Sequence, residues 1–293
     1  MNKLVTIGLP FFNSENTLEF AINSVLMQTH KNIELIIIND GSNDNSDKIV
    51  RKFLKHDPRI KYFQFKDNMG LVFRLNQIVE LSNSDYIARM DSDDIMLNTR
   101  IEKQLNILLD DTTIDVVATG IYTIDELNNP IGIRDIKPIE TSIKKILEKK
   151  FITHPTILAR RIWFLKNKYL NYQRAEDLEL WLRTCNSTKF YRIEEPLYIY
   201  REGNVNVSNY LKTNKTFLKL LNEHKNINVK NSYILKLKFL TYLKSFLFSF
   251  FGYFNLQYLL VKKRNHLLNN EEKKLVNEII SSVKNYKQSY EKV

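Results

Sequence analysis

The stretch Ser84–Asp94, SDYIARMDSDD, is a short apolar run that ends in three carboxylates. Side chains two residues apart on an extended segment point the same way, so we expect Asp91 and Asp93 to face one ligand where a strand ends. Hard carboxylate oxygens suit Mg²⁺ or Mn²⁺, which proteins commonly hold with one or two carboxylates and the phosphates of a substrate. The stretch therefore predicts a divalent cation and a nucleoside-diphosphate substrate.

Other interpretations of this stretch need no ligand. Acidic residues after a strand often solvate a loop or favour the start of the next helix, and Thr99 with Glu102 predicts a capping box for the helix that follows. A calcium-binding EF-hand loop is set aside, because Ile95 and Met96 stand where an oxygen ligand and the turn glycine are needed. The metal site and the plain loop both remain open on this stretch alone.

The composition indicates a globular protein. The chain has 293 residues, of which 43% are hydrophobic, enough for one large or two smaller domains. Its single cysteine, Cys185, excludes an intramolecular disulfide and fits a reducing compartment. The apolar run Leu4–Leu9 is too short for a signal-peptide core, so we expect a cytoplasmic protein.

Positive charge is concentrated at one end of the chain. Residues 208–293 hold 16 Lys and Arg against 5 Asp and Glu, whereas residues 1–207 hold 28 of each, so the whole excess of +11 lies in the last third. A neutral body with a basic tail favours an anionic partner that meets the tail, and it argues against a nucleic-acid groove. The change of composition near residues 203–208 is the predicted domain boundary.

Apolar runs and helical patterns alternate over residues 4–120. The run Leu35–Ile38 has no polar alternation, as is typical of a strand buried on both faces of a parallel sheet. Between the strands, apolar residues recur at helical spacing over residues 18–26 and 101–109. The predicted strands are Leu4–Leu9, Glu34–Ile38, Ile60–Phe65, Asp85–Met90 and Asp115–Thr119. The predicted fold is an open α/β sheet, whose ligands collect outside the carboxyl ends of its strands.

Polar, turn-forming segments follow four of these strands. A shared site explains this better than chance loop composition does. The segments are Pro10–Glu15, Asn39–Ser42, Asp67–Gly70 and Asp91–Asp94. Further along, a turn is predicted at Asn128–Pro130, a helix near Ser142–Lys149, and a helix whose first turn holds Glu176 and Asp177.

These motifs, in this order, resemble the family 2 glycosyltransferases with the GT-A nucleotide-sugar-binding fold, in particular those that build bacterial envelope polysaccharides. The resemblance covers about residues 1–205. The segments that carry it are Val5–Glu15 (VTIGLPFFNSE), Ile36–Ser46 (IIINDGSNDNS), Asp67–Asn76 (DNMGLVFRLN), Ser84–Gln104 (SDYIARMDSDDIMLNTRIEKQ) and Ala175–Arg183 (AEDLELWLR). It implies a Rossmann-like, mostly parallel sheet flanked by helices. Residues 1–120 would bind the nucleotide sugar, residues 121–205 would form the acceptor side, and residues 206–293 would form a helical region.

The resemblance also implies roles for single residues. Pro10 and Glu15 would border the nucleoside, and Asp40 would accept a hydrogen bond from the uracil. Asn68, Gly70 and Arg74 would line the diphosphate. In the DXD motif, Asp91 would approach the ribose or the metal and Asp93 would ligate the metal, and Asp177 would be the catalytic base. These residue types suit such roles, since Arg pairs with phosphate oxygens and Gly permits close backbone approach.

The implied reaction is inverting transfer from a UDP-sugar, with Mn²⁺ or Mg²⁺, to a hydroxyl of a glycan or lipid-linked acceptor. His154, Glu176 and Arg201 are candidates for the acceptor or phosphate side. Trp181 could stack on a sugar ring, but its helical spacing with Leu178 favours core packing. Relatives often carry a His two residues after the Tyr-Arg pair that Arg201 completes, and this chain has Gly203 there.

The tail predicts contact with a membrane surface. Its most apolar part, Ser245–Val261, has 17 residues and includes Gly252, Asn255 and Gln257, which is marginal for a membrane span. Surrounding lysines favour an interfacial helix on the anionic inner leaflet, released by high salt. Alternatively, Phe246, Phe250 and Phe254 pack against the catalytic domain or a second subunit.

Two other functions compete with the glycosyltransferase. A sugar-nucleotide nucleotidyltransferase would need a glycine-rich, basic phosphate loop after the first strand, where this chain has Pro10–Asn13. A non-catalytic membrane or nucleic-acid binder could use the same fold, although the intact acidic set argues against lost activity.

Overall fold

The computed structural model describes residues 2–148, 151–172, 174–203, 206–223, 229–254, 256 and 265–286. Its strands are β1 (Val5–Phe11), β2 (Ile33–Asp40), β3 (Ile60–Phe65), β4 (Tyr86–Arg89), β5 (Ile95–Met96), β6 (Val116–Ile124), β7 (Pro130–Arg134), β8 (Leu158–Arg160) and β9 (Phe190–Arg201). Its helices are α1 (Leu18–Leu26), α2 (Ser46–Leu54), α3 (Leu71–Leu81), α4 (Arg100–Asp110), α5 (Ile143–Leu147), α6 (Arg161–Lys166), α7 (Glu176–Thr184), α8 (Val207–Glu223), α9 (Asn231–Tyr253) and α10 (Asn270–Lys284), with a short 3₁₀ helix at His154–Thr156. The five predicted strands are confirmed as β1 to β4 and β6, with ends shifted by a few residues.

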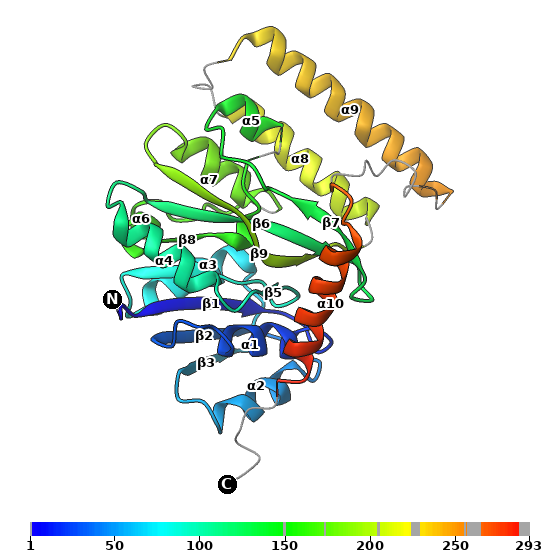
Figure 1. The fold of residues 1–293 in the computed structure, drawn as a ribbon. Helices are drawn as coiled ribbons and strands as arrows, with labels where there is room; N and C mark the ends of the chain where they lie inside the picture. The colour runs from blue at the N-terminus through cyan, green and yellow to red at the C-terminus, as the bar shows by residue number, and fades with distance from the viewer. Residues whose placement is uncertain are drawn as a thin grey trace.

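The sheet is parallel in its first half and mixed in its second. The strand order is β3-β2-β1-β4-β8-β6-β9-β5, and β7 pairs with β6 (Figure 1). Strands β3, β2, β1 and β4 run parallel, as do β6 and β9, whereas β8, β7 and β5 pair antiparallel to their neighbours. The predicted mostly parallel α/β sheet is confirmed.

Strand β2 separates two cores, as its unbroken apolar run predicts. Leu35 and Ile37 pack on one face with α1, α2 and α4, and Ile36 and Ile38 pack on the other with α3. All four side chains are fully buried. Alternate residues of a strand point to opposite faces, so this run fixes β2 at the centre of a three-layer structure.

Helix α3 lies very close to β1 because of Gly8. A Cβ at Gly8 would come 2.5 Å from Cγ2 of Ile78, which is closer than carbon atoms pack. A larger residue at position 8 would press on the Ile78 side chain of α3. Residues at the ends of β1 and β2, and in the turn after β4, lie near the start of α3.

The capping box predicted for α4 is wrong. Thr99 is the N-cap residue but makes no capping hydrogen bond with its side chain. Instead the Glu102 carboxylate accepts a 2.6 Å hydrogen bond from the Thr29 hydroxyl. A hydrogen bond to the distant Thr29 thus replaces the predicted bond to the nearby Thr99 backbone.

Two predictions for the middle of the chain are confirmed. The turn at Asn128–Pro130 is the β6–β7 connection, and the helix near residue 142 is α5, with Ser142 as its cap.

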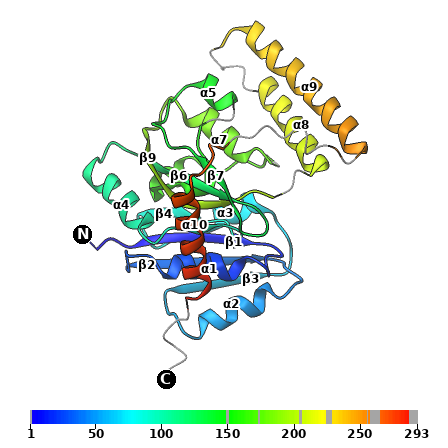
Figure 2. The same cartoon turned by 45° about the vertical axis from the view of Figure 1, so that its right-hand side comes forward.

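The basic last third forms two separate structures. Helices α8 and α9 stand beside the body, whereas α10 crosses α1 (Figures 1 and 2). Val276, Ile280 and Val283 of α10 are buried in a cluster that includes Tyr122 and Ile124 of β6. The division into residues 1–205 and 206–293 stays a prediction. Helix α10, from beyond the proposed boundary, packs on the body.

Candidate active site

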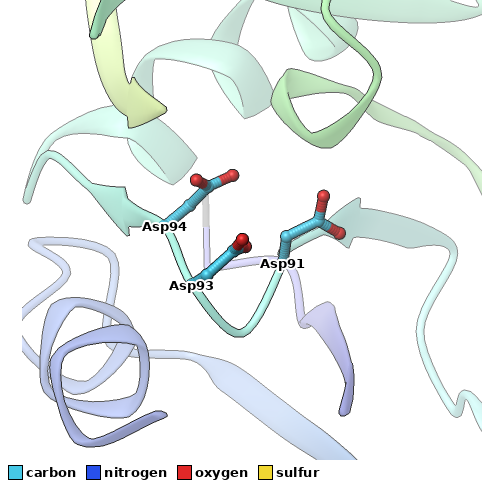
Figure 3. A group of neighbouring side chains, drawn as sticks. All are labelled: Asp91, Asp93 and Asp94. Atoms are coloured by element: carbon cyan, nitrogen blue, oxygen red, sulfur yellow. The ribbon is translucent and has the colours of Figure 1, made fainter. Parts of the chain in front are cut away.

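Three carboxylates meet in the turn after β4. Ligand oxygens of Asp91, Asp93 and Asp94 all lie within 4.8 Å of one another. Figure 3 shows the three side chains on one short turn. The expected extended geometry is wrong, because β4 ends at Arg89 and a turn follows in which the Asp94 amide faces the Asp91 carbonyl oxygen. The turn brings the side chains together and adds Asp94 to the predicted pair.

The electrostatics of this turn fit a divalent cation. Burial and the neighbouring Asp91 charge raise the pKa of Asp93 to about 6, against the opposing charges of Arg201 and Arg89. Burial, with the charges of Asp93 and Asp91, raises the pKa of Asp94 well above its usual range. Crowded carboxylates disfavour one another's ionisation unless a cation lies among them. The hard oxygen donors are those that Mg²⁺ or Mn²⁺ prefers.

Two segments from elsewhere in the chain hold the turn in place. Arg201, at the end of β9, donates from its amide to Oδ1 of Asp94 and from Nε to the Asp93 carbonyl oxygen, both at 2.8 Å. Ser14, after β1, shares a 2.8 Å hydrogen bond with Ser92. These contacts assign Arg201 a positioning role at the acidic turn, while its predicted contact with phosphate or acceptor stays a prediction.

A cleft of about 520 Å³ opens beside the acidic turn. It unites the ends of β1, β2 and β4 with the start of α3, as expected of ligand sites in α/β sheets. Its lining includes Pro10, Asp40, Asn68, Gly70, Arg74, Asp91 and Asp93, which is all but one of the residues predicted to bind the nucleotide sugar. The remaining residue, Glu15, is exposed, and its carboxylate accepts two hydrogen bonds from Asn45.

Asp40 and Arg74 form a buried ion pair on one wall of the cleft. Oδ1 of Asp40 accepts from Nε of Arg74 at 2.6 Å and from the Met69 amide at 2.9 Å, and Oδ2 accepts from the Gly70 amide at 2.8 Å. The Arg74 guanidinium lies 4.0 Å from the centre of the Phe65 ring. The pair thus fixes the loop before α3, where Gly70 adopts a φ of 85° that favours glycine. Contacts of Asp40 with uracil and of Arg74 with phosphate stay predictions.

Arg89 connects the acidic turn to the predicted catalytic helix. Its guanidinium is 5% exposed and forms a 2.9 Å ion pair with Asp91. Burial acts to lower the pKa of Arg89, but the negative charges around it, including those of Asp91 and Glu176, raise it above its usual range. Asp91 of the acidic turn and Glu176 of α7 therefore both act electrostatically on one buried cation.

Glu176 and Asp177 form an acidic pair in the first turn of α7. Burial and the charge of Asp177 raise the pKa of Glu176 to about 7, although Arg89 opposes this. Both side chains are half-buried. Two carboxyls at one helix start, with one pKa near neutral, are a frequent arrangement in acid–base catalysis.

We expect the Glu176→Gln variant to be more stable than the wild type at pH 8, by about 1–2 kcal/mol, and nearly equal to it at pH 4.5. The folded protein retains a proton on Glu176 that the unfolded chain releases above its usual pKa of 4.5. The free energy of unfolding of the wild type therefore falls as the pH rises from 4.5 to 7, and the variant lacks this contribution. Urea unfolding without divalent cations at both pH values measures the difference.

The control for this prediction is Glu19→Gln, which removes one carboxylate from an exposed position of α1. Because Glu19 is exposed, Glu19→Gln should change the free energy of unfolding much less than Glu176→Gln does at pH 8. A Glu176→Gln variant that parallels the wild type across this pH range would show that the Glu176 proton is not retained on folding.

His154 and Trp181 lie in an aromatic cluster beneath the site. His154 is 5% exposed and its Nε2 is 2.7 Å from the Tyr169 hydroxyl. Burial, with the nearby Arg89 charge, lowers the pKa of His154 well below its usual range. Trp181 is 2% exposed and packs edge-on against His154 and Phe151. The structure thus supports core packing for Trp181. His154 is buried against Tyr169 and Trp181, and its predicted contact with the acceptor or phosphate stays a prediction.

Two residues of this site, Asp94 and Arg89, were not predicted from the sequence. Asp94 stands in the acidic run Asp91–Asp94, and its burial has no local sequence signal. Arg89 ends β4 two residues before Asp91, and its guanidinium pairs with that carboxylate. A buried cation next to an acidic turn was the available signal. Neither residue was included among the candidate site residues.

With this geometry established, comparison with known proteins identifies the family. Residues 6–169 match the family model described as "Glycosyl transferase family 2". The chain belongs to glycosyltransferase family 2. The family commonly uses a divalent metal, which agrees with the acidic turn.

Named relatives of this glycosyltransferase include bacterial enzymes. It is 34% identical to "Putative glycosyltransferase EpsE" of Bacillus subtilis (strain 168) over 206 residues, covering 68% of this chain and 73% of EpsE. It is 33% identical to "O-antigen biosynthesis glycosyltransferase WbnJ" of Escherichia coli over 211 residues, covering 69% of this chain and 80% of WbnJ.

Solved structures confirm that the glycosyltransferase has the GT-A fold. Staphylococcus aureus TarS residues 1–349, solved in complex with UDP, match with a TM-score of 0.60 and 15% identity, covering 95% of this chain and 80% of that one. The same TarS fragment in complex with UDP-GlcNAc also gives a TM-score of 0.60, at 16% identity, covering 80% of this chain and 70% of that one. At 15–16% sequence identity, the similarity to TarS shows a shared fold only.

Proposed function

We propose that this glycosyltransferase moves a sugar from a UDP-sugar to a hydroxyl of a glycan or lipid-linked acceptor, with inversion, in the synthesis of a bacterial cell-surface polysaccharide. The observation that carries the proposal is the cleft that includes the acidic turn. Beside it, Arg89 pairs with Asp91 and is acted on electrostatically by Glu176 of α7. The UDP and UDP-GlcNAc complexes of TarS support the donor class. The name of WbnJ supports the polysaccharide product.

The donor would occupy the cleft between β1, β2 and α3. The nucleoside would lie near Pro10 and Asp40, and the diphosphate would extend along Asn68 and Gly70 toward the acidic turn. Asp91 and Asp93, with Asp94 beside them, would hold Mn²⁺ or Mg²⁺, which when bound takes up charge on the departing diphosphate. Arg201 keeps this turn in shape through its hydrogen bonds to Asp93 and Asp94.

Asp177 would act as the general base. It would take the proton of the acceptor hydroxyl as that oxygen forms a bond to the anomeric carbon, on the face opposite UDP. The bond from the anomeric carbon to the diphosphate oxygen breaks, and UDP leaves with the electron pair. Glu176, whose pKa is raised to about 7, would be a second proton acceptor next to Asp177. Arg89 would hold Asp91 beside the donor through their ion pair.

Release of UDP tests the proposal. Full-length protein is incubated with UDP-glucose, UDP-galactose or UDP-N-acetylglucosamine, with and without Mn²⁺, and the nucleotide products are identified. We expect one donor to give UDP and free or transferred sugar, with Mn²⁺ present. Formation of UTP from a UDP-sugar and pyrophosphate would identify a nucleotidyltransferase instead. No nucleotide product and no thermal stabilisation by any donor would indicate a non-catalytic protein.

We also propose that the enzyme works at the inner face of the cell membrane, where a lipid-linked acceptor would be available. The concentration of positive charge in residues 208–293 supports this location. Among the helices that the structure describes, none is long and apolar enough to cross a membrane. The proposed location is therefore peripheral.

A further inference from the structure

Helix α9 presents a continuous apolar face to the outside. Its exposed large hydrophobic residues recur every three or four positions, which places them on one side of the helix. With the exposed fraction of each, they are Leu235 66%, Phe239 67%, Tyr242 63%, Leu243 42%, Phe246 66%, Phe250 53% and Tyr253 84%. We call this row the α9 stripe. Soluble monomers rarely expose a continuous apolar row of this length without a function.

The opposite side of α9 is held by α8. Phe248 is buried and its ring stacks on Tyr210 of α8, with 3.8 Å between ring centres. Asn214 of α8 donates a 3.0 Å hydrogen bond to the Ser245 hydroxyl. In both views α9 is the outermost element, with α8 between it and the body (Figures 1 and 2). The alternative that Phe246 and Phe250 pack on the catalytic domain is therefore wrong, since both remain more than half exposed.

The charges around the stripe favour an anionic partner. Residues 231–253 contain Lys236, Lys238 and Lys244 and neither Asp nor Glu. A groove of about 560 Å³ between α8 and α9 meets the stripe at Tyr242. Lys215, Lys219 and Glu223 line it, with Glu223 3.6 Å from Lys219. A second copy of the chain would bring the same lysines face to face, which is unfavourable, whereas anionic headgroups would complement them.

We propose that α9 docks the enzyme on an anionic lipid surface, lying flat with the stripe in the interface and the lysines at headgroup level. A helix with aromatic and leucine residues on one side and lysines near them is typical of interfacial binding. At about 35 Å, α9 is long enough to seat its whole stripe on such a surface. This inference rests on the proposed function in one respect: a lipid-linked acceptor would give the enzyme a reason to bind a membrane surface.

Vesicle sedimentation of the full-length protein tests the surface. The probes are phosphatidylcholine vesicles with and without about a third phosphatidylglycerol. The test variant is Phe239→Gln with Phe246→Gln and Phe250→Gln, and the control is Leu127→Gln with Ile162→Gln and Leu267→Gln, three exposed apolar residues away from the stripe. We expect the wild type and the control to bind anionic vesicles and the test variant to bind at least tenfold more weakly.

Salt and association state complete the test. Binding of the wild type should weaken between about 0.01 M and 1 M salt, as the Debye length falls from about 30 Å to 3 Å. Absence of binding to anionic vesicles at low salt, or equal binding by the test variant, would overturn the inference. So would a wild type that dimerises through the stripe, seen as a concentration-dependent mass that the test variant lacks.

Donor hydrolysis without vesicles separates this inference from the proposed function. The test variant should hydrolyse the UDP-sugar at the wild-type rate, which also shows that it is folded. Vesicle binding without any UDP-sugar turnover would leave the docking surface intact and contradict the proposed function. Turnover with stripe-independent vesicle binding would contradict the docking surface alone.

Discussion

The Asp177→Asn variant is expected to lose sugar transfer by about 10²–10⁴-fold in kcat, with little change in donor affinity. An amide cannot accept the proton of the acceptor hydroxyl, so the attacking oxygen would have to carry its proton into the transition state. The cleft proposed for the donor lies at the acidic turn and the start of α3, and its lining does not include Asp177. Rates of UDP release with acceptor present, together with calorimetric titration of UDP, measure the two quantities separately.

The control for this experiment is Asp110→Asn, which makes the same change at an exposed position of α4 and should leave kcat unchanged. Glu176→Gln distinguishes the members of the acidic pair. If Asp177 is the base, Glu176→Gln retains more activity than Asp177→Asn. A larger loss in Glu176→Gln would assign the proton transfer to Glu176, whose pKa near 7 also suits a base.

The second large effect is expected at Asp93. The Asp93→Asn variant should have at least 100-fold lower metal-dependent turnover than the wild type. Its remaining turnover should be close to that of the wild type in EDTA. Charge stabilisation of a departing diphosphate by a metal contributes several kcal/mol, and each 1.36 kcal/mol is tenfold in rate. Asp93 supplies one of three clustered carboxylates, so its loss removes both a ligand and a negative charge. Turnover against Mn²⁺ concentration gives the measurement.

Readdition of metal is the control at this site. Excess Mn²⁺ should restore the EDTA-treated wild type but not Asp93→Asn. Calorimetry should show that Mn²⁺ strengthens UDP binding to the wild type and not to the variant. A wild type that works at full rate in EDTA would contradict the assignment of the acidic turn as a metal site.

Much of the fold could be predicted because its signals are local. The run Leu35–Ile38 within β2 is apolar at consecutive positions, as is typical of a strand buried between two helix layers. The antiparallel strands β5, β7 and β8 were not predicted, because with 2, 5 and 3 residues they carry no periodic signal. They form because the neighbouring strands offer them partners. The capping box at Thr99 failed for a related reason, since Glu102 found a distant hydroxyl instead.

The candidate site divides in the same way. Its acidic residues could be selected from the sequence because each follows a strand or starts a helix. Their environment could not be predicted. The fixed position of Arg201 depends on residues 76 and 108 positions away in the sequence. The burial of His154 depends on Tyr169 and on Trp181 of α7.

The sequence by itself determined the α/β class, the strand β2 that is buried on both faces, and the order of the motifs along the chain, because hydrophobic period and turn residues act over a few positions. Only the tertiary structure decided that three carboxylates share one turn, that the buried Arg89 pairs with Asp91 of that turn, and that the aromatic residues of α9 face outward. These features depend on which surfaces meet across the folded chain. Burial, charge crowding and exposure are properties of that arrangement, and no single segment specifies them.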